Sequence, residues 1–172
     1  IKIKGNSVGV ESKKIIAYLP ERTYLNKQMK ASEVIEFFND FYDNFDADKA
    51  KKLLKDLDLD INKNLSKMSK GMQEKVQLVL VMSRSADLYI LDEPLGGVDP
   101  ATRDYILDTI LSNFNENASV IISTHLISDI ERILDEVIFI DKGRVILHED
   151  ADKLRNKEKS SIDEVFRRMF KC

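Results

Sequence analysis

The stretch from Met68 to Asp99 reads MSKGMQEKVQLVLVMSRSADLYILDEPLGGVD, and it decides the fold that we expect for this chain. Four apolar residues, 88–91, run straight into Asp92 and Glu93, and Pro94 follows them. A short apolar run of this kind is typical of a strand buried on both faces, as in a parallel sheet. Proline ends such a strand because it has no N–H group to donate. We therefore expect the two carboxylates at the carboxyl end of a central strand, where open α/β sheets place ligands.

Asp92 and Glu93 are neighbours, so their side chains should point to opposite sides of the strand. The two carboxylates therefore cannot do the same work. One can hold a hydrated Mg²⁺ ion, which prefers oxygen ligands and keeps its waters. The other can polarise an attacking water as a general base. The pair taken alone also fits two exposed acids that open a turn, and the flanking segments must decide between these readings.

Two flanking segments favour a site for an anion. Upstream, Ser69-Lys70-Gly71 precedes a segment from Met72 to about Ser85 whose apolar residues predict a mostly buried helix. A serine and a glycine at a helix start offer a hydroxyl and free N–H groups to an anion. Downstream, a Gly-Gly turn leads to Asp99, a good N-cap, and to Pro100, a good first residue for the next helix.

The rest of the chain alternates strand and helix patterns. Apolar residues at helical spacing predict helices from Ala31 and over 46–58, and we expect the aromatic residues there to lie mostly in the core. Short apolar runs predict a half-exposed edge strand over 1–5, further strands over 13–19 and 118–123, and a hairpin of 136–141 with 144–149. Helices are also expected over 101–114, over 126–134 and from Asp150 onward.

The order of these motifs resembles the nucleotide-binding domain of ABC transporters. MSKGMQ lies where the family has its LSGGQ signature, and LYILDE resembles its Walker B strand with the catalytic glutamate, Glu93. The segment 97–99 resembles the D-loop, and His125, after Ser123-Thr124, resembles the switch histidine. Each motif alone is weakly specific, but four in this order and spacing make a strong signal. The resemblance covers nearly the whole chain.

The resemblance implies an α/β fold of the P-loop NTPase class. A largely parallel central sheet, incomplete at its N-terminus, would carry an inserted α-helical signature subdomain. We expect a single partial ABC ATPase domain over 1–172. Its parts are two N-terminal strands with a Q-loop-like segment (1–25), the helical subdomain with the signature (26–86), the Walker B, D-loop and switch core (87–149), and a helical tail (150–172).

The resemblance also implies functional residues and cofactors. ATP and Mg²⁺ are the expected cofactors, with Glu93 and His125 as catalytic residues and Asp92 as a metal ligand. Ser69, Lys70, Gly71, Met72 and Asp99 are the expected nucleotide-binding residues, and Glu21 is a Q-loop-like residue and a second expected metal ligand.

Three positions depart from the family pattern. Glu21 stands where the family has the Q-loop glutamine, and it can offer oxygen to Mg²⁺ but cannot donate a hydrogen bond as an amide does. Lys70 replaces a glycine of the signature, which adds a positive charge but also bulk where glycine permits close approach. Met72 replaces the signature glutamine.

No G-x-x-x-x-G-K-[ST] motif occurs in this chain, although an ATPase of this class needs such a P-loop to cradle the phosphates. The chain therefore resembles a fragment that begins after the Walker A region. Without that cradle, carboxylates face the place where the triphosphate should bind, and their negative charge repels it. We therefore expect this chain alone to be inactive.

The expected partners are ATP, a transmembrane permease subunit and a second nucleotide-binding domain, with the protein cytoplasmic and peripheral to the inner face of the membrane. The resemblance also implies a docking site for a transmembrane coupling helix, and we expect it on the surface near Tyr24 and the first helix. Residues 160–166 resemble the closing motif of ATPases that serve ABC-2-type exporters. Net charge is −3, so composition gives no reason to expect nucleic-acid binding. One cysteine, Cys172, excludes a disulfide framework.

Two alternative functions stay open at the level of sequence. One is a soluble ABC-type ATPase of translation or repair. Repair proteins place a long coiled coil between Q-loop and signature, whereas only 22–68 intervenes here, and translation proteins carry two such domains. The other is a non-catalytic ABC-like binding module, which would have no use for the Asp92-Glu93 pair and His125.

Overall fold

The computed structural model describes residues 1–114 and 117–170, and it divides the chain into two compact units. The first unit is Ile1–Thr124 and contains a parallel sheet, and the second is His125–Cys172 and contains an antiparallel pair of strands. No helix in the described ranges is long and apolar enough to cross a membrane.

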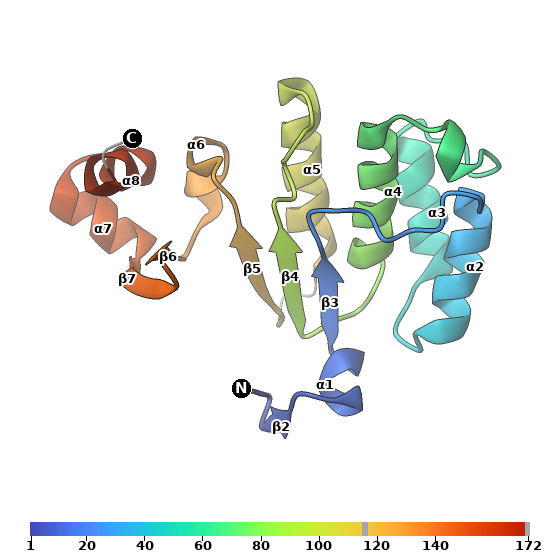
Figure 1. The fold of residues 1–172 in the computed structure, drawn as a ribbon, viewed down its shortest axis with the longest axis horizontal. Helices are drawn as coiled ribbons and strands as arrows, with labels where there is room; N and C mark the ends of the chain where they lie inside the picture. The colour runs from blue at the N-terminus through green and yellow to red at the C-terminus, as the bar shows by residue number, and fades with distance from the viewer. Residues whose placement is uncertain (115–116, 171–172) are drawn as a thin grey trace. The chain divides into compact units, whose positions relative to one another are not determined.

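The sheet of the first unit has three parallel strands in the order β3-β4-β5 (Figure 1). They are β3 (Ile16–Leu19), β4 (Leu88–Asp92) and β5 (Ser119–Ser123), and helix α5 (Pro100–Asn113) connects β4 to β5. β4 is the middle strand of the three, and it ends at Asp92. The prediction of an α/β fold with the acidic pair at the end of a central parallel strand is therefore confirmed.

The expectation that these strands are buried on both faces is wrong. In β4 only Tyr89 and Leu91 are fully buried, whereas Leu88 and Ile90 are half-buried. In β5 the side chain of Ile121 is 54% exposed. Alternate residues of a strand face opposite sides of the sheet, so the described residues cover one face much better than the other. An apolar run predicts which strand residues could be buried. The packing of neighbouring elements determines which of them are buried in the fold.

Three helices form a separate cluster beside β3, which Figure 1 shows at the end of the sheet away from β5. They are α2 (Ala31–Phe41), α3 (Ala47–Asp56) and α4 (Lys70–Met82), and the short 3₁₀ helix η1 (Leu65–Lys67) precedes α4. Their apolar faces share one hydrophobic core. Asp46 caps α3 by accepting a hydrogen bond from the Lys49 N–H at 2.8 Å. This arrangement agrees with the predicted helical subdomain.

One part of the core prediction for these helices is wrong. Phe38 is buried, but Phe37 and Phe41 are 57% and 67% exposed. The rings of these two residues lie one turn apart on α2 and stack, with centroids 6.0 Å apart and planes at 13°. They lie outside the stripe of α2 that faces α3 and α4, so helical spacing alone could not assign them to the core.

The N-terminal segment differs from the two strands that the pattern predicts. β1 (Lys2–Ile3) and β2 (Asn6–Ser7) form a short antiparallel pair, and α1 (Val10–Lys14) occupies the first part of the expected strand 13–19. The Ser12 hydroxyl accepts from the Gly9 N–H at 2.9 Å and donates to the Gly9 carbonyl at 3.0 Å. These local hydrogen bonds close a helical turn that the apolar pattern does not reveal.

The second unit contains the predicted hairpin. β6 (Glu136–Asp141) pairs with β7 (Arg144–Asp150), and α7 (Ala151–Glu158) and α8 (Ile162–Phe170) follow. The helix expected over 126–134 is only α6 (Ile127–Ile130), continued by the 3₁₀ helix η2 (Glu131–Ile133). Buried residues of β6, α6, α7 and α8 share one core.

Candidate functional site

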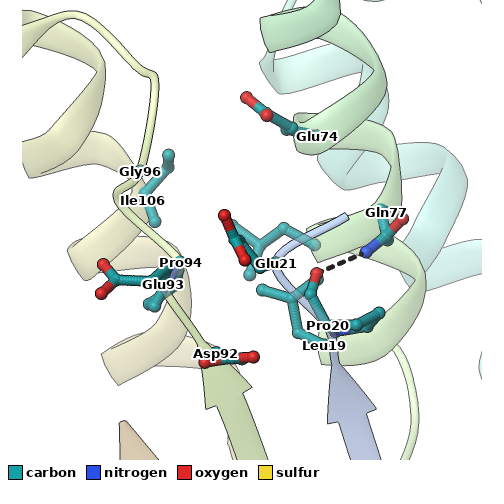
Figure 2. Close-up of a pocket in the computed structure, with 11 residues that line it drawn as sticks. Leu19, Pro20, Glu21, Glu74, Gln77, Asp92, Glu93, Pro94, Gly96 and Ile106 are labelled. Carbon is teal, nitrogen blue, oxygen red and sulfur yellow. Dashed lines mark hydrogen bonds between the residues drawn. The ribbon is translucent and has the colours of Figure 1, made fainter. Parts of the chain in front are cut away.

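A small pocket lies at the carboxyl ends of β3 and β4 in the first unit (Figure 2). Its volume is about 20 Å³, so it has room for about one water molecule. Residues from β3, β4, the segments that follow these strands, α4 and α5 line it: Leu19, Pro20, Glu21, Glu74, Gln77, Leu78, Asp92, Glu93, Pro94, Gly96 and Ile106. The pocket brings together three predicted site residues, Glu21, Asp92 and Glu93.

Hydroxyl groups at the end of β5 hold the two adjacent carboxylates. The Ser123 hydroxyl donates to Asp92 Oδ1 at 2.5 Å, and the Thr124 hydroxyl donates to Glu93 Oε2 at 3.1 Å. Glu93 has a φ of +48°, which is uncommon for a residue other than glycine. Figure 2 shows the two carboxylates directed to opposite sides of the strand end. Each acid therefore has surroundings of its own, as predicted, although Glu93 lies just past the strand and its positive φ, rather than strand alternation, accompanies its orientation.

Two more carboxylates, Glu21 and Glu74, line the same pocket, so four acids surround it. Carboxylate oxygens are ligands that Mg²⁺ takes, and this ion is commonly held by one or two of them together with waters and substrate phosphates. Among the described residues, no group of three acidic, histidine or cysteine side chains could hold a metal ion by itself. The carboxylate oxygens at the pocket suit a metal ion that is also bound by a phosphate. The metal role of Asp92 and Glu21 stays a prediction.

The signature-like segment forms the first turn of α4. The Ser69 hydroxyl caps the helix by accepting from the Met72 N–H at 3.3 Å, and a Cβ added at Gly71 would meet nothing within 4 Å. Lys70 is mostly exposed and pairs with Glu74 one turn later, at 3.5 Å between Nζ and Oε1. Met72 packs against the core of the helical cluster. A helix start with an open glycine can receive an anion, and the nucleotide-binding role of all four residues stays a prediction.

The D-loop-like segment lies against this helix start. Gly97 has a φ of +72°, and a Cβ placed there would lie 3.5 Å from Lys70 Nζ. Asp99 caps α5: its carboxylate accepts from the Thr102 N–H at 3.1 Å and from the Thr102 hydroxyl at 2.6 Å. These hydrogen bonds, with the hydroxyl first, lower the pKa of Asp99. The predicted cap and the helix start at Pro100 are confirmed, and nucleotide binding by Asp99 stays a prediction.

His125 is the first residue of the second unit, directly after Thr124. Its catalytic role stays a prediction from the sequence.

Sequence reasoning missed two residues that line the pocket. Glu74 follows Lys70 by four residues, a spacing that places both on one face of a helix. Gln77 is only 2% exposed and stands among the apolar residues of α4. An amide in a buried run is the signal that could have revealed it, because buried polar groups are retained where they find a hydrogen-bond partner.

A second, larger hollow lies on the other side of β3. This groove has a volume of about 520 Å³ and lies between β3 and α2. Residues that line it include four exposed or half-buried aromatic side chains and one guanidinium, namely Tyr18, Tyr24, Phe41, Tyr42 and Arg84. The Arg84 guanidinium lies 3.8 Å from the centre of the Tyr42 ring. An apolar groove with aromatic walls suits a protein segment better than a small polar substrate.

Desolvation, and then the neighbouring Tyr42, raise the pKa of Tyr24 to about 12. We therefore expect its phenol to ionise about two pH units above the pKa of a free tyrosine. The unfolded chain would ionise Tyr24 near pH 10. The raised pKa therefore contributes stability that is complete below pH 10 and lost as pH rises through 12. The difference in 295 nm absorbance between the wild type and Tyr24→Phe should show a midpoint near pH 12. The Tyr24 residue as a whole is 55% exposed, so a midpoint near 10 would show that water reaches its hydroxyl and that desolvation does not raise its pKa.

Comparisons with known proteins give one consistent result. The family model described as "ABC transporter" matches residues 1–96. An uncharacterized ABC transporter ATP-binding protein of Methanocaldococcus jannaschii is 32% identical over 140 residues, which cover 76% of this chain and 52% of that protein. The ABC transporter ATP-binding protein YtrB of Bacillus subtilis is 26% identical over 156 residues, which cover 87% and 53%. The chain thus spans about half the length of these relatives.

Among solved structures, one titled "Structure of ATP binding subunit of ABC transporter" is similar with a TM-score of 0.81. The identity is 26%, and the match covers 92% of this chain and 69% of that one. The described architecture is therefore that of ABC ATP-binding subunits.

Proposed function

We propose that this protein binds and hydrolyses ATP to power transport through a separate membrane protein, from the premise that the chain belongs to the ABC transporter family. One observation carries the proposal. Asp92 and Glu93 stand at the end of the middle parallel strand, and the Ser123 and Thr124 hydroxyls hold them in separate orientations. This arrangement supports the proposal, because two carboxylates with separate surroundings can take different roles at the place where open α/β sheets bind ligands.

In the proposed reaction, Glu93 accepts a proton from the water that attacks the γ-phosphate. A general base must lie within hydrogen-bond reach of that water, and Glu93 stands directly after β4, beside the pocket. The Thr124 hydroxyl orients the carboxylate by donating to Oε2. His125, as the switch histidine, would donate to the γ-phosphate.

The magnesium ion that accompanies ATP would neutralise phosphate charge when bound. Asp92 and Glu21 are the proposed ligands, because their oxygens line one pocket and suit a hard cation. The Ser123 hydroxyl keeps Asp92 oriented by donating to Oδ1.

A second nucleotide-binding domain is the proposed partner for the start of α4. Ser69, Lys70, Gly71 and Met72 would close on ATP held by that second domain, and Asp99 would lie at the same interface. The open space at Gly71 and the ammonium of Lys70, whose side chain is 82% exposed, support this use, because both can approach a phosphate from outside the chain.

The groove between β3 and α2 is the proposed docking site for a helix of the transmembrane permease subunit. Its aromatic walls include Tyr24 and Phe41, and the exposed stack of Phe37 on Phe41 extends the apolar surface along α2. Such a partner would place the protein in the cytoplasm at the inner face of the membrane. The exporter-like residues 160–166 favour export as the direction of transport.

The test compares two proteins, the 172-residue chain and the gene product translated from its start codon. Mg-ATP binding is measured by calorimetric titration and hydrolysis by phosphate release. We expect the gene product to bind and hydrolyse ATP, and this chain, which contains no P-loop motif, to be inactive with a dissociation constant of roughly 1 mM or weaker. Micromolar binding by the chain would contradict the expected weakness. A gene product without hydrolysis would favour a non-catalytic module.

A further inference from the structure

Helix α4 contains a buried amide that holds the segment of Glu21. Gln77 is 2% exposed, and its Nε2 donates to the carbonyl of Pro20 at 3.1 Å (Figure 2). A carbonyl only accepts, so this contact fixes which end of the amide faces Pro20. Pro20 directly precedes Glu21, and both line the pocket with Asp92. The amide thus links α4 to the residue before a predicted metal ligand.

A second buried amide lies one turn earlier on the same helix. Gln73 is 8% exposed, and its Nε2 donates to the carbonyls of Leu65 and Met68, both at 3.0 Å. Met68 directly precedes Ser69, the cap of α4. Gln73 therefore fixes the approach of the chain to the signature-like turn, as Gln77 fixes its approach to Glu21.

The burial of Gln77 carries a cost that points to a specific use. Its Oε1 is buried and has no hydrogen-bond partner within the ranges that the structure describes. A buried acceptor without a partner is unfavourable, and a leucine or methionine would fill the same space without that cost. The amide is therefore poorly explained by packing alone, and its contact with the Pro20 carbonyl is what an apolar side chain could not supply.

We propose that Gln73 and Gln77, the glutamine pair, are positioning residues. Their amides hold the signature-like turn and the Glu21 segment in fixed positions relative to one helix, α4. The proposal rests on the function proposed above, because it gives the pair a purpose in that site. Residues four apart lie on one face of a helix, so both segments are tied to neighbouring points of α4. A shift of α4 would move both together.

The first test uses trypsin on the 172-residue chain, because Arg22 and Lys67 lie beside the two held segments. Gln77→Met removes the donor at nearly constant volume. Loss of one hydrogen bond should raise local opening, and hence cleavage after Arg22, roughly two- to tenfold. Gln73→Met is the matched control and should raise cleavage after Lys67 but not after Arg22. Urea unfolding checks that each variant is folded. If Gln77→Met does not fold, Gln77→Asn takes its place, because its side chain is one methylene shorter and its amide cannot reach the Pro20 carbonyl.

The outcomes distinguish local positioning by each glutamine from a general loss of stability in the variants. Selective cleavage, each variant opening its own segment, supports the proposal. The proposal is overturned if either variant speeds cleavage equally after Arg22 and after Lys67. It is also overturned if neither variant speeds cleavage at either site.

The second test measures hydrolysis by the gene product. Gln77→Met should lower kcat by a similar factor, roughly two- to tenfold, with a smaller change in KM, because Glu21 is displaced rather than removed. An unchanged kcat in an active enzyme overturns the positioning role while the proposed function stands. If the wild-type gene product hydrolyses nothing, the proposed function fails, and the selectivity of cleavage still decides whether the pair positions both segments.

Discussion

Replacing Glu93 with glutamine in the gene product should lower the turnover of ATP by roughly 10²–10⁴-fold, the usual contribution of general acid–base catalysis. Glutamine keeps the shape of the side chain and can still accept from the Thr124 hydroxyl, which lies 3.1 Å from Glu93 Oε2. It has no carboxylate to accept a proton from water. We therefore expect turnover to fall while the dissociation constant of Mg-ATP changes by less than about threefold.

Glu36→Gln is the matched control for this prediction. Glu36 is exposed on α2 and is not among the residues that line the pocket. The same change of charge there should leave turnover within about twofold, as for most surface substitutions. Phosphate-release kinetics and a binding titration on the same preparations check both values. A Glu93→Gln variant with near-normal turnover would show that another group activates the water.

Replacing Arg84 with methionine should lower the free energy of unfolding of the first unit by about 3 kcal/mol or more. Arg84 is 5% exposed, and its guanidinium donates to the carbonyls of Ile16 at 2.6 Å and Lys14 at 3.0 Å. It also donates to Asn44 Oδ1 at 3.1 Å. Methionine fills part of the space but donates none of these three hydrogen bonds, and only the Lys14 carbonyl keeps another side-chain donor, the Asn44 amide at 3.0 Å. Hydrogen bonds from charged groups are worth about 1.5–3 kcal/mol each.

The position of Arg84 explains why so large an effect is expected. Its partners belong to the end of α1, the start of β3 and the loop between α2 and α3, so one side chain ties the sheet to the helical cluster. Arg144→Met, an exposed arginine at the start of β7, is the control and should change stability by less than about 0.5 kcal/mol. Equilibrium urea unfolding followed by circular dichroism measures both. A loss below about 1 kcal/mol for Arg84→Met would contradict the linking role.

Several features of this fold could be predicted from residue order because they depend on local chemistry. An apolar run that ends in Asp-Glu-Pro is enough to place β4 and its acidic end, since proline stops the strand. Asp99 before Pro100 is enough to start α5, because the carboxylate and the ring both suit a helix N-terminus. The order of motifs was likewise enough to indicate the family.

Other features depended on which segments meet in space. The expected burial of β4 and β5 on both faces was wrong, because covering elements, and not strand residues, remove a face from water. Phe37 and Phe41 were expected in the core and lie exposed, because the orientation of α2 is set by its contacts with α3 and α4. The α1 turn arose from hydrogen bonds between Gly9 and Ser12, which an apolar pattern does not register.

The sequence by itself determined the acidic pair, its place at a strand end and the family, because these follow from neighbouring residues and their spacing. Only the tertiary structure decided which distant groups serve that pair. Ser123 and Thr124 reach Asp92 and Glu93 because β5 lies beside β4 in register, and Gln77 reaches Pro20 because α4 packs on β3. Such contacts join residues 31 to 57 positions apart, and a hydrogen bond between them exists only once the elements have packed.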